Sequence, residues 1–496
     1  MKRQRVLIPT RGTVALDIIM SLRSMGLETI LLYSPEDAGS LPVKLADRSY
    51  KFYSSRPEDS YMDLESIMEM AVELGVDYLH PGYGFLSENP ELAEQCARHG
   101  ITFIGPSADV LHRVRDKIEL KNTAQRIGIQ TLPHSEVINS PLDIEFVSPD
   151  MKFPVIIKPV TGTGGHQIRV AEFRRDAQDK LQQMLKRSAI QQHGVFLEEF
   201  LPFAHHIEIP FLRDASGNLL IMPEIESSIQ RRFQKVFQES PSVNISDDLR
   251  QSMMQDVRRL VEELSYVGLG YVEFLVEKGE AFFSEINPTI QVNTLIPEIH
   301  MLSNFIKKQF VLARGEQLHN VDGLRIFEPR HNLILVSLNA ENPHDDFRPS
   351  AGTVKDFFHY ATIRNVFKTS LFAGAEVSSI YDPNIGKILS FAVQRGNAIN
   401  DLRQFLDTIL VRGIHTNLIF LKKLLESPHL LRGETIVDFL NLRFEFAKRP
   451  RSEKEVELAA ALLGAAFHVE NRRKNYKAQL ERMKQPNLLR RIFLGR

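Results

Sequence analysis

Two glutamates and an asparagine near the middle of the chain carry the residue types of a divalent-metal site. Glu273 lies in the apolar run Tyr271–Val276, and Glu285 lies in the run Ala281–Ile286, with Asn287 just beyond. The Glu-Lys-Gly sequence between the runs predicts a β-hairpin, which can bring both carboxylates to one face. Carboxylate and amide oxygens suit Mg²⁺, which takes its other ligands from water and nucleotide phosphates. The alternative is an ordinary hairpin with two solvated acids.

A glycine-rich turn could bind phosphate. The predicted strand Phe153–Pro159 carries Lys158 near its end, ThrGlyThrGlyGly follows at 161–165, and a returning strand is expected at 168–170. Glycines let backbone N–H groups approach phosphate oxygens, and a lysine adds a point charge. The turn is not a Walker loop, because no GlyLysSer/Thr follows, nor a dinucleotide fingerprint, because a strand rather than a helix comes next. The alternative is a flexible surface hairpin.

The first hundred residues predict an open parallel sheet. Strands are expected at 5–10, 29–32, 78–79 and 101–104, and a helical pattern begins near Val14. This strand–helix–strand order is typical of a parallel α/β layer. The segment His80–Cys96 follows a strand, where such sheets bind ligands.

The rest of the chain alternates helical and strand patterns. One charged helix is expected from Ser107 through Lys117, residues 131–150 are interpreted as a surface linker, and a polar helix is expected over 172–193. Later patterns are a strand at 194–202, a mixed sheet that includes the metal hairpin, a basic run at 229–241, a strand-rich segment from about 330, and helices at 399–411 and 416–426.

Bulk composition indicates a globular protein of several domains. The chain has 496 residues, 43% hydrophobic and 25% charged, with a formal net charge of −1. That length predicts two to four domains, and the charge argues against nucleic acid as a partner. The single cysteine excludes an internal disulfide and fits a reducing cytoplasm, where we expect the protein. We expect neither a signal peptide nor a membrane span.

The last fifty residues form a basic tail. From residue 448 to the end there are 13 lysines and arginines against 5 acidic residues. A helical pattern over Glu455–Met483 carries an apolar stripe, so we interpret the tail as a helical appendage that docks on a partner or on a second copy.

Taken together, seven stretches resemble the biotin carboxylase family, the ATP-grasp component of acyl-CoA and pyruvate carboxylases. In chain order they are HPGYGFLSEN (80–89), DK (116–117), PVIIKP (154–159) with the glycine turn, QRRFQK (230–235), the metal hairpin, NAENP (339–343) and YDPNIGK (381–387). The resemblance implies a Rossmann-like pre-ATP-grasp domain over 1–115, an ATP-grasp domain over 116–322 with a mobile lid at about 131–203, a β-rich C-terminal domain over 323–446, and the helical tail over 447–496.

The resemblance also implies a role for each matching residue. The implied nucleotide set is Lys117, Lys158, Gly162, Gly164, Gly165, Glu198, Glu199, Leu201, His206, Gln230 and Leu275. The lysines would hold ATP phosphates, the glycines would close over them, and the glutamate strand would contact adenine above Leu275. The implied metal ligands are Glu273, Glu285 and Asn287, for Mg²⁺ with Mn²⁺ as an alternative. Lys235, Gln291 and Val292 would act on bicarbonate.

The carboxyl-acceptor half of the family pattern is different here. The family has Arg-x-Gln-Val-Glu after the metal hairpin, whereas this chain has Thr289 and Asn293 in place of the arginine and glutamate. A second family arginine is Ser337, and a family histidine is Phe233. Asparagine cannot act as the base for bicarbonate. One lost preorganised cation costs about 3–4 kcal/mol of transition-state stabilisation.

Three functional hypotheses follow. The first is an ATP-dependent ligase or carboxylase with a non-standard acceptor, activating bicarbonate or another small carboxylic acid as an acyl phosphate. The second is a catalytically silent ATP-binding subunit of an acyl-CoA carboxylase. The third is a divergent biotin carboxylase subunit that uses a separate biotin carrier protein, because this chain has no Ala-Met-Lys-Met biotinylation site. The resemblance further implies a homodimer.

Overall fold

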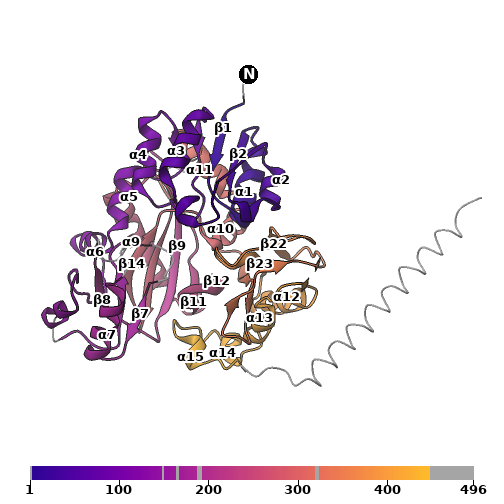
Figure 1. The fold of residues 1–496 in the computed structure, drawn as a ribbon. Helices are drawn as coiled ribbons and strands as arrows, with labels where there is room; N and C mark the ends of the chain where they lie inside the picture. Colours follow the sequence, from indigo (N-terminus) through magenta and orange to yellow (C-terminus); the bar gives the residue numbers. More distant parts are fainter. Residues whose placement is uncertain (1–2, 148–149, 163–166, 187–192, 319–322, 447–496) are drawn as a thin grey trace, which may run out of the picture. The chain divides into compact units, whose positions relative to one another are not determined.

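The computed structural model describes residues 3–147, 150–162, 167–186, 193–318 and 323–446 (Figure 1). The predicted basic tail and the predicted phosphate-turn glycines Gly164 and Gly165 lie outside these residues. No helix in the described ranges is both long enough and apolar enough to cross a membrane.

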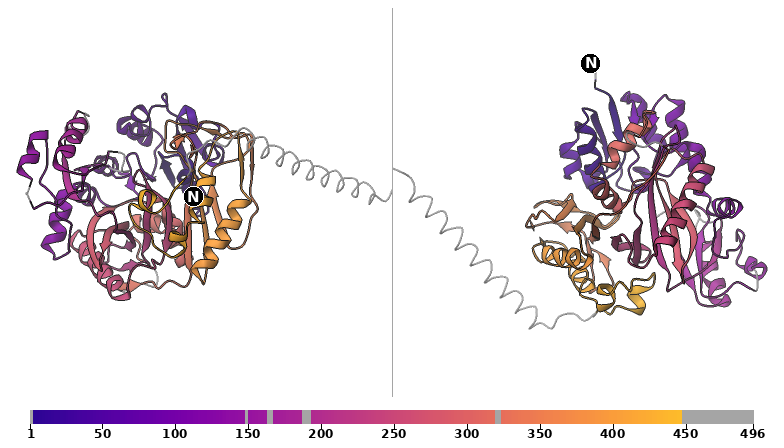
Figure 2. Two further views of the ribbon diagram at one scale, coloured as in Figure 1. Left: turned by 90° about the horizontal axis from the view of Figure 1, so that it is seen from below. Right: turned by 180° about the vertical axis from the view of Figure 1, so that it is seen from behind.

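A five-stranded parallel sheet opens the chain, in the order β3-β2-β1-β4-β5. The strands are β1 (Arg5–Ile8), β2 (Glu28–Tyr33), β3 (Arg48–Lys51), β4 (Tyr78–Leu79) and β5 (Thr102–Phe103). The helices of this part are α1 (Gly12–Arg23), α2 (Leu41–Leu45), α3 (Leu64–Glu73), α4 (Pro90–Arg98) and α5 (Ala108–Arg115). Figure 2 shows them packed around the sheet. The predicted Rossmann-like parallel layer is therefore confirmed, and Cys96 is fully buried within it.

Glycine is required where the chain leaves β4. Gly82 has a φ of +76°, and a Cβ there would lie 2.5 Å from the Thr10 side chain. Any larger residue would push this loop away from the carboxyl end of β1, so the first segment of the resemblance, His80–Asn89, is held close to the sheet.

The single charged helix expected around Lys117 is in fact two helices. Helix α5 ends at Arg115, and α6 (Lys117–Arg126) begins after Asp116, whose extended backbone interrupts the helix. The Asp116 carboxylate accepts hydrogen bonds from the backbone N–H groups of Ile118 and Glu119, as an N-cap does. Lys117 is therefore the first residue of a helix.

A separate three-stranded sheet has the order β7-β6-β8. Its elements are β6 (Val155–Pro159), β7 (Arg169–Ala171), β8 (Val195–Glu199) and the helix α7 (Arg174–Met184). The interpretation of residues 131–150 as a surface linker was wrong. Ile138, Ile144 and Val147 are buried in the core of this layer, and backbone hydrogen bonds join Ile138 to Val195. The Pro/Ser/Asp composition hid these apolar positions.

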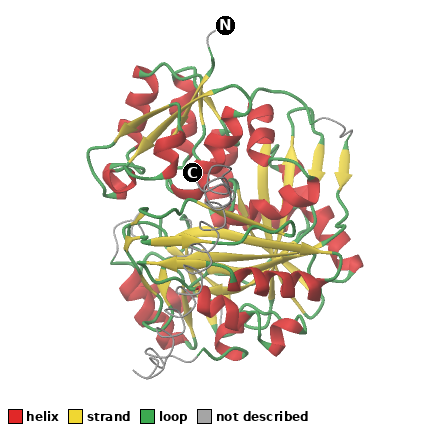
Figure 3. Ribbon diagram, turned by 90° about the vertical axis from the view of Figure 1, so that its right-hand side faces the viewer, coloured by secondary structure: helices red, strands yellow, loops and turns green. Residues whose placement is uncertain are grey.

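The largest sheet has ten strands, seen as the long yellow strands of Figure 3. They are β9 (His205–Arg213), β10 (Leu219–Ile221), β11 (Ile225–Arg231), β12 (Gln234–Ser240), β13 (Gly268–Glu277), β14 (Glu280–Asn287), β15 (Leu324–Ile326), β16 (Asn332–Asn339), β21 (Asn365–Thr369) and β23 (Asn384–Ala392). Its main path runs β14-β13-β9-β11-β12-β16-β23-β21. The pairing of β12 with β16 joins the strands up to Ser240 and those from Asn332 onward in one sheet.

The basic run at 229–241 is a hairpin, which the sequence pattern did not predict. Strands β11 and β12 pair across a turn at Arg232 and Phe233, which both have positive φ, 50° and 63°. Two left-handed residues match a two-residue hairpin turn.

Helices cover the sheet and complete the C-terminal part. They are α9 (Asp247–Glu263), α10 (Leu295–Met301), α11 (Phe305–Ala313), α12 (Arg395–Asp407), α13 (Leu418–Leu424), α14 (Pro428–Leu431) and α15 (Phe439–Leu442). Short strands form three further pairs, β17 (Glu341–Asn342) with β18 (Arg348–Pro349), β19 (Gly352–Thr353) with β22 (Glu376–Val377), and β20 (Asp356–Phe358) with β24 (Leu410–Arg412). The prediction of a β-rich C-terminal part is confirmed.

Candidate functional site

The predicted metal hairpin forms and brings its three polar residues together. Glu273 on β13 lies directly opposite Glu285 on β14, and Asn287 lies opposite Tyr271. Opposed residues of an antiparallel pair share a face, so both carboxylates and the amide project to one side. The Asn287 Nδ2 donates to Glu273 Oε1 over 2.7 Å.

A third acid, which sequence reasoning had missed, joins the row. Glu208 on β9 pairs in register with Glu273 and is fully buried. The Lys235 ammonium bridges the two, 2.9 Å from Glu208 Oε2 and 2.7 Å from Glu273 Oε1. Burial alone would lower the pKa of Lys235, but the two carboxylates raise it well above its ordinary value. The row therefore holds a permanently charged lysine.

His206 links this row to the next hairpin. Its Nε2 lies 2.7 Å from Glu273 Oε2, and its Nδ1 lies 2.5 Å from the Gln230 amide nitrogen. Burial would raise the pKa of Glu273, but Lys235 and His206 lower it well below its ordinary value. Leu275 pairs with His206 on the same face as Glu273. Three predicted residues, His206 on β9, Lys235 on β12 and Asn287 on β14, thus contact the Glu273 carboxylate.

Lys117 reaches the hairpin from the start of α6. Its Nζ lies 2.5 Å from Glu285 Oε2, and its backbone N–H donates to Val160 O over 3.2 Å. Burial would lower the pKa of Lys117, but Glu285 raises it, so the pKa lies above its ordinary value. The Asp116 cap positions this lysine because it starts the helix there.

A second buried ion-pair cluster surrounds Glu198. Lys158 on β6 places its Nζ 2.5 Å from Glu198 Oε2, and Lys121 on α6 forms an ion pair with the other carboxylate oxygen. Lys121 and Glu198 are each 1% exposed. Burial would raise the pKa of Glu198, but the two lysines lower it to about 2. Lys121 was not predicted, although it lies one helical turn beyond Lys117.

The remaining nucleotide predictions lie around these clusters, but not all on one face. Glu199 follows Glu198 on β8, so its side chain faces the other way, and it accepts from the Lys152 N–H over 3.0 Å. Leu201 is half-buried just beyond the strand. Gly162 has a φ of +137°, a conformation that favours glycine.

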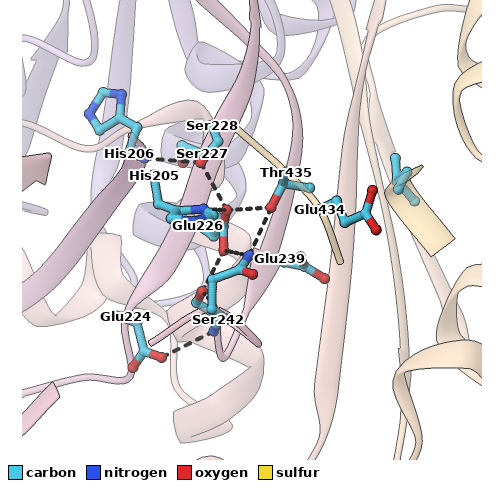
Figure 4. A network of polar contacts seen from close by, with 12 residues as sticks. His205, His206, Glu224, Glu226, Ser227, Ser228, Glu239, Ser242, Glu434 and Thr435 are labelled. Carbon is cyan, nitrogen blue, oxygen red and sulfur yellow. Dashed lines mark hydrogen bonds and ion pairs between the residues drawn. The ribbon is translucent and has the colours of Figure 1, made fainter. Parts of the chain in front are cut away.

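A separate buried network lies behind His206 (Figure 4). Glu226 on β11 accepts hydrogen bonds from Ser228, Ser242 and Thr435, and His205 Nδ1 lies 2.9 Å from the same carboxylate. The His206 backbone N–H donates to Ser228 Oγ over 3.0 Å, while its ring points away from Glu226, because neighbouring strand residues alternate faces. The network ties β9 and β11 to the C-terminal segment.

The predicted bicarbonate residues follow β14. Gln291 Nε2 donates to Thr289 Oγ1 over 3.1 Å, and the Gln291 backbone N–H donates to Thr294 Oγ1. Val292 is half-buried in the following turn. The Gln291 side chain therefore lies against Thr289, the residue at the position of the first family arginine.

Two of the substituted positions carry buried polar atoms without partners. Asn293 is 1% exposed and Ser337 is 3% exposed, and among the described residues neither amide atom of Asn293 nor the Ser337 hydroxyl has a hydrogen-bond partner. Each such group costs about 1–3 kcal/mol. Natural structures keep few of them, so these atoms are candidates for ligand contacts.

Two residues of the His80–Asn89 segment lie close to the clusters. Burial raises the pKa of Glu88 to about 7, the Glu285 charge adds to this, and Lys117 opposes it. Burial raises the pKa of Tyr83, Asp382 adds to this, and Lys235 opposes it. Glu88 was part of the recognised segment, but no pattern distinguished it from a surface acid.

In the described ranges, no three or more histidine, cysteine, aspartate and glutamate side chains group as a metal site. The predicted set instead contains two carboxylates and one amide. Both carboxylates are held by lysines, so the donors are assembled and charge-balanced.

Comparison with protein-family models gives three matches in chain order. Residues 2–111 match the N-terminal domain of biotin carboxylase, residues 116–321 match the ATP-binding domain of the carbamoyl-phosphate synthase L chain, and residues 336–442 match the C-terminal domain of biotin carboxylase.

Curated relatives and solved structures agree with these matches. Biotin carboxylase 1 of Bacillus subtilis is 32% identical over 442 residues, covering 88% of this chain and 98% of the relative. The biotin carboxylase of Pseudomonas aeruginosa is 32% identical over 452 residues, covering 90% and 99%. The biotin carboxylase domain of Hydrogenobacter thermophilus 2-oxoglutarate carboxylase, a dimer in complex with MgADP, ADP and bicarbonate, superposes with a TM-score of 0.85 at 28% identity, covering 90% of this chain and all of that one.

Proposed function

The chain belongs to the biotin carboxylase family of ATP-dependent carboxylases, and on that premise we propose that it is an ATP-dependent ligase with a non-standard acceptor. The activated group would be bicarbonate or another small carboxylate, converted to an acyl phosphate. The observation that supports this proposal is a difference between the nucleotide side and the acceptor side of the site. The nucleotide and metal residues form connected ion pairs, whereas the substituted Asn293 and Ser337 hold buried polar atoms without partners among the described residues.

The donor set fits Mg²⁺. Glu273, Glu285 and Asn287 offer hard oxygen ligands on one face, and their number leaves positions for water and phosphate oxygens. Bound there, Mg²⁺ would neutralise charge on the transferring phosphoryl group. Mn²⁺ accepts the same ligands.

The lysines supply the charge for phosphate binding. Lys117 and Lys158 each end in a buried ion pair, and both ammonium groups lie beside acids that a metal or nucleotide would contact. In this proposal they bind phosphate oxygens, and Glu198, ionised by its two lysines, accepts from the adenine amino group. His206, Gln230 and Leu275 complete the nucleotide contacts, as do the backbone of Glu199 and Leu201 and the glycine turn.

Lys235, Gln291 and Val292 would hold the carboxylate that receives the phosphoryl group. Lys235 is the only one of these three with a formal charge, and its position between Glu208 and Glu273 fixes its ammonium. The residues stabilise charge by position rather than by covalent chemistry, as is general for phosphoryl transfer.

The acceptor side lacks the groups for carboxylating biotin. Asn293 has no basic oxygen at neutral pH, and Thr289 and Ser337 bring no positive charge. These three uncharged, hydrogen-bonding side chains suit an acceptor that needs no deprotonation by Asn293. We therefore propose that the acceptor is not biotin and that this chain carries no covalent biotin.

The test is ATP turnover by the purified protein. ADP release is measured with bicarbonate, with free biotin, and with a panel of small carboxylic acids. Release that occurs only with a carboxylic acid other than bicarbonate supports the proposal. Release that requires both bicarbonate and biotin would make the chain a divergent biotin carboxylase subunit. Tight MgATP binding without release would make it a silent ATP-binding subunit.

The assembly and the domain limits are proposals of the same kind. We propose a homodimer, supported by the dimeric 2-oxoglutarate carboxylase domain. The proposed docking target of the basic tail is a carboxylase partner subunit or a second copy of the chain, and a biotin carrier protein is a partner only if the chain is a divergent biotin carboxylase subunit. The domain limits 1–115, 116–322 with a lid at 131–203, 323–446 and 447–496 remain predictions, as does a cytoplasmic location.

A further inference from the structure

Three polar residues form one row across the C-terminal part of the ten-stranded sheet. Ser337 on β16 lies opposite Lys387 on β23, which lies opposite Lys368 on β21. Directly opposed residues of antiparallel strands project from the same face, so the three side chains are neighbours. Lys368 Nζ lies 3.4 Å from Asp17 Oδ2 on α1 and 3.2 Å from Glu298 Oε2 on α10. The row thus faces α1 and α10.

The two lysines of the row have different surroundings. Lys368 is neutralised by two carboxylates, whereas Lys387, only 4% exposed, has no hydrogen bond or ion pair among the described residues. Burial lowers the pKa of Lys387, the charge of the neighbouring Lys368 lowers it further, and the charges of Asp17 and Glu298 oppose this from a distance. The neighbouring Ser337 hydroxyl is also buried without a partner in the described part of the chain.

An unpaired ammonium in a buried place costs several kcal/mol, and an unpaired hydroxyl adds to the cost. Two such groups side by side are therefore unfavourable unless something binds them. A ligand with acceptor oxygens and a negative charge would satisfy both, because lysine and serine can each donate hydrogen bonds to it.

The row borders the proposed acceptor site. Lys387 ends the segment Tyr381–Lys387, in which Asp382 lies near enough to Tyr83 to raise the pKa of its phenol, while Lys235 lowers it. Glu298, which contacts the row, follows Asn293 by little more than one helical turn. Ser337 itself stands where the family resemblance places an arginine.

We propose that Lys387 and Ser337 form a subsite for the carboxylate group of the substrate. The inference rests on the proposed function and specifies it further. Lys387 belongs to the segment shared with the family, and with Ser337 opposite it in place of an arginine, its ammonium is the cation of this pair of positions. A lysine is a point charge without the fixed fork of arginine, so this subsite accepts a carboxylate with less geometric selection. The same chemistry would hold bicarbonate or an organic carboxylate.

Binding of two labelled anions to the full chain tests the subsite. ¹³C-bicarbonate and carboxyl-labelled ¹³C-acetate are titrated and followed by NMR line broadening, with wild-type protein, Lys387→Met and the matched control Lys368→Met. We expect Lys387→Met to weaken anion binding tenfold or more. Lys368→Met should stay within twofold, because its ammonium is already paired.

Comparing the two anions shows whether the subsite binds bicarbonate or an organic carboxylate. If Lys387→Met weakens the binding of bicarbonate but not of acetate, the subsite binds bicarbonate. If it weakens the binding of acetate, with or without an effect on bicarbonate, the subsite binds an organic carboxylate. Equal losses in the two variants, or no binding of either anion to the wild type, would overturn the inference.

A charge-replacement variant separates binding from folding. In Lys387→Met, the additional change Ser337→Arg should return anion affinity to within threefold of the wild type, since it restores one cation to the row. A folded double variant that stays weak would contradict the subsite. The readout needs no ATP turnover. A protein that binds anions through Lys387 but releases no ADP contradicts only the proposed function. A protein that turns over but binds no anion contradicts only this inference.

Discussion

Replacing Lys235 with methionine tests how the acid row is held together. Its ammonium is the described counter-ion shared by Glu208 and Glu273, which are 0% and 3% exposed. Removing one partner of a buried ion pair leaves an uncompensated charge and costs about 3–5 kcal/mol of unfolding free energy. Lys278→Met is the matched control. Lys278 is 86% exposed beside Glu277, so its loss should change stability by no more than about 0.5 kcal/mol.

The loss of stability in Lys235→Met should depend on pH, because Glu273 can be protonated. In the wild type the pKa of Glu273 is below its ordinary 4.5, so its stabilisation is present above pH 4.5 and disappears as the pH falls through the lower folded-state value. In Lys235→Met, burial is no longer opposed by the ammonium, so the folded-state pKa rises. Protonation of Glu273 then removes its uncompensated charge in the variant. The difference in unfolding free energy between Lys235→Met and the wild type should therefore be smaller at pH 5 than at pH 7.

Urea unfolding followed by far-UV circular dichroism measures this, since the chain has no tryptophan. Adding Glu208→Gln to Lys235→Met removes one unpaired charge and should recover at least about 1 kcal/mol at pH 7. A Lys235→Met protein within about 1 kcal/mol of the wild type at pH 7, or a difference that is the same at pH 5, would show that Lys235 does not hold the acid row together.

Three further predictions concern the neighbouring charges. Glu285→Gln should weaken MgATP binding at least about tenfold, a loss of about 1.4 kcal/mol, as measured by calorimetry. The control Glu280→Gln, at an exposed position, should leave the affinity unchanged. Equal MgATP affinities of the two variants would show that Glu285 does not bind the metal. The folded-state pKa of Glu88 is raised to about 7, so the unfolding free energy of the wild type should decline from pH 5 to 7. Glu88→Gln should reduce that decline, as measured by urea titration. If the unfolding free energies of the two proteins change with pH in the same way, the prediction is wrong. Lys121→Met should cost about 3 kcal/mol at pH 7, whereas Lys423→Met, at a position on α13 that is 62% exposed, should cost less than about 0.5 kcal/mol. Similar urea midpoints for the two variants would show that the Glu198 cluster does not need Lys121.

The metal hairpin was predictable because its signals are local. Alternating apolar residues and a Lys-Gly turn define the two strands, and period-two geometry then places Glu273 and Glu285 together. The parallel N-terminal sheet followed from the same kind of evidence.

Glu208 and Lys121 were not predictable in this way. Glu208 meets Glu273 only because β9 pairs with β13, some sixty residues later in the chain, and local sequence does not define that register. Lys121 looks like a surface lysine on a polar helix until Glu198 is placed beside it. Asp116 as a helix cap was missed because a charged run can also continue a helix.

The neighbours of Ser337 also depend on the fold. The sequence predicts the loss of an arginine there, but Lys387 lies opposite it only through the pairing of β16 with β23. Which residues surround a substituted position is therefore defined by strand register, here between residues fifty positions apart in the chain.

The central claim is that the nucleotide half of the site is retained while the acceptor half has been exchanged. It is tested most directly by incubating the unmodified protein with MgATP, labelled bicarbonate and free biotin, and measuring bound nucleotide and labelled carboxybiotin in the same sample. We expect bound MgATP and no carboxybiotin. Rapid formation of carboxybiotin, or failure to bind MgATP, would contradict it.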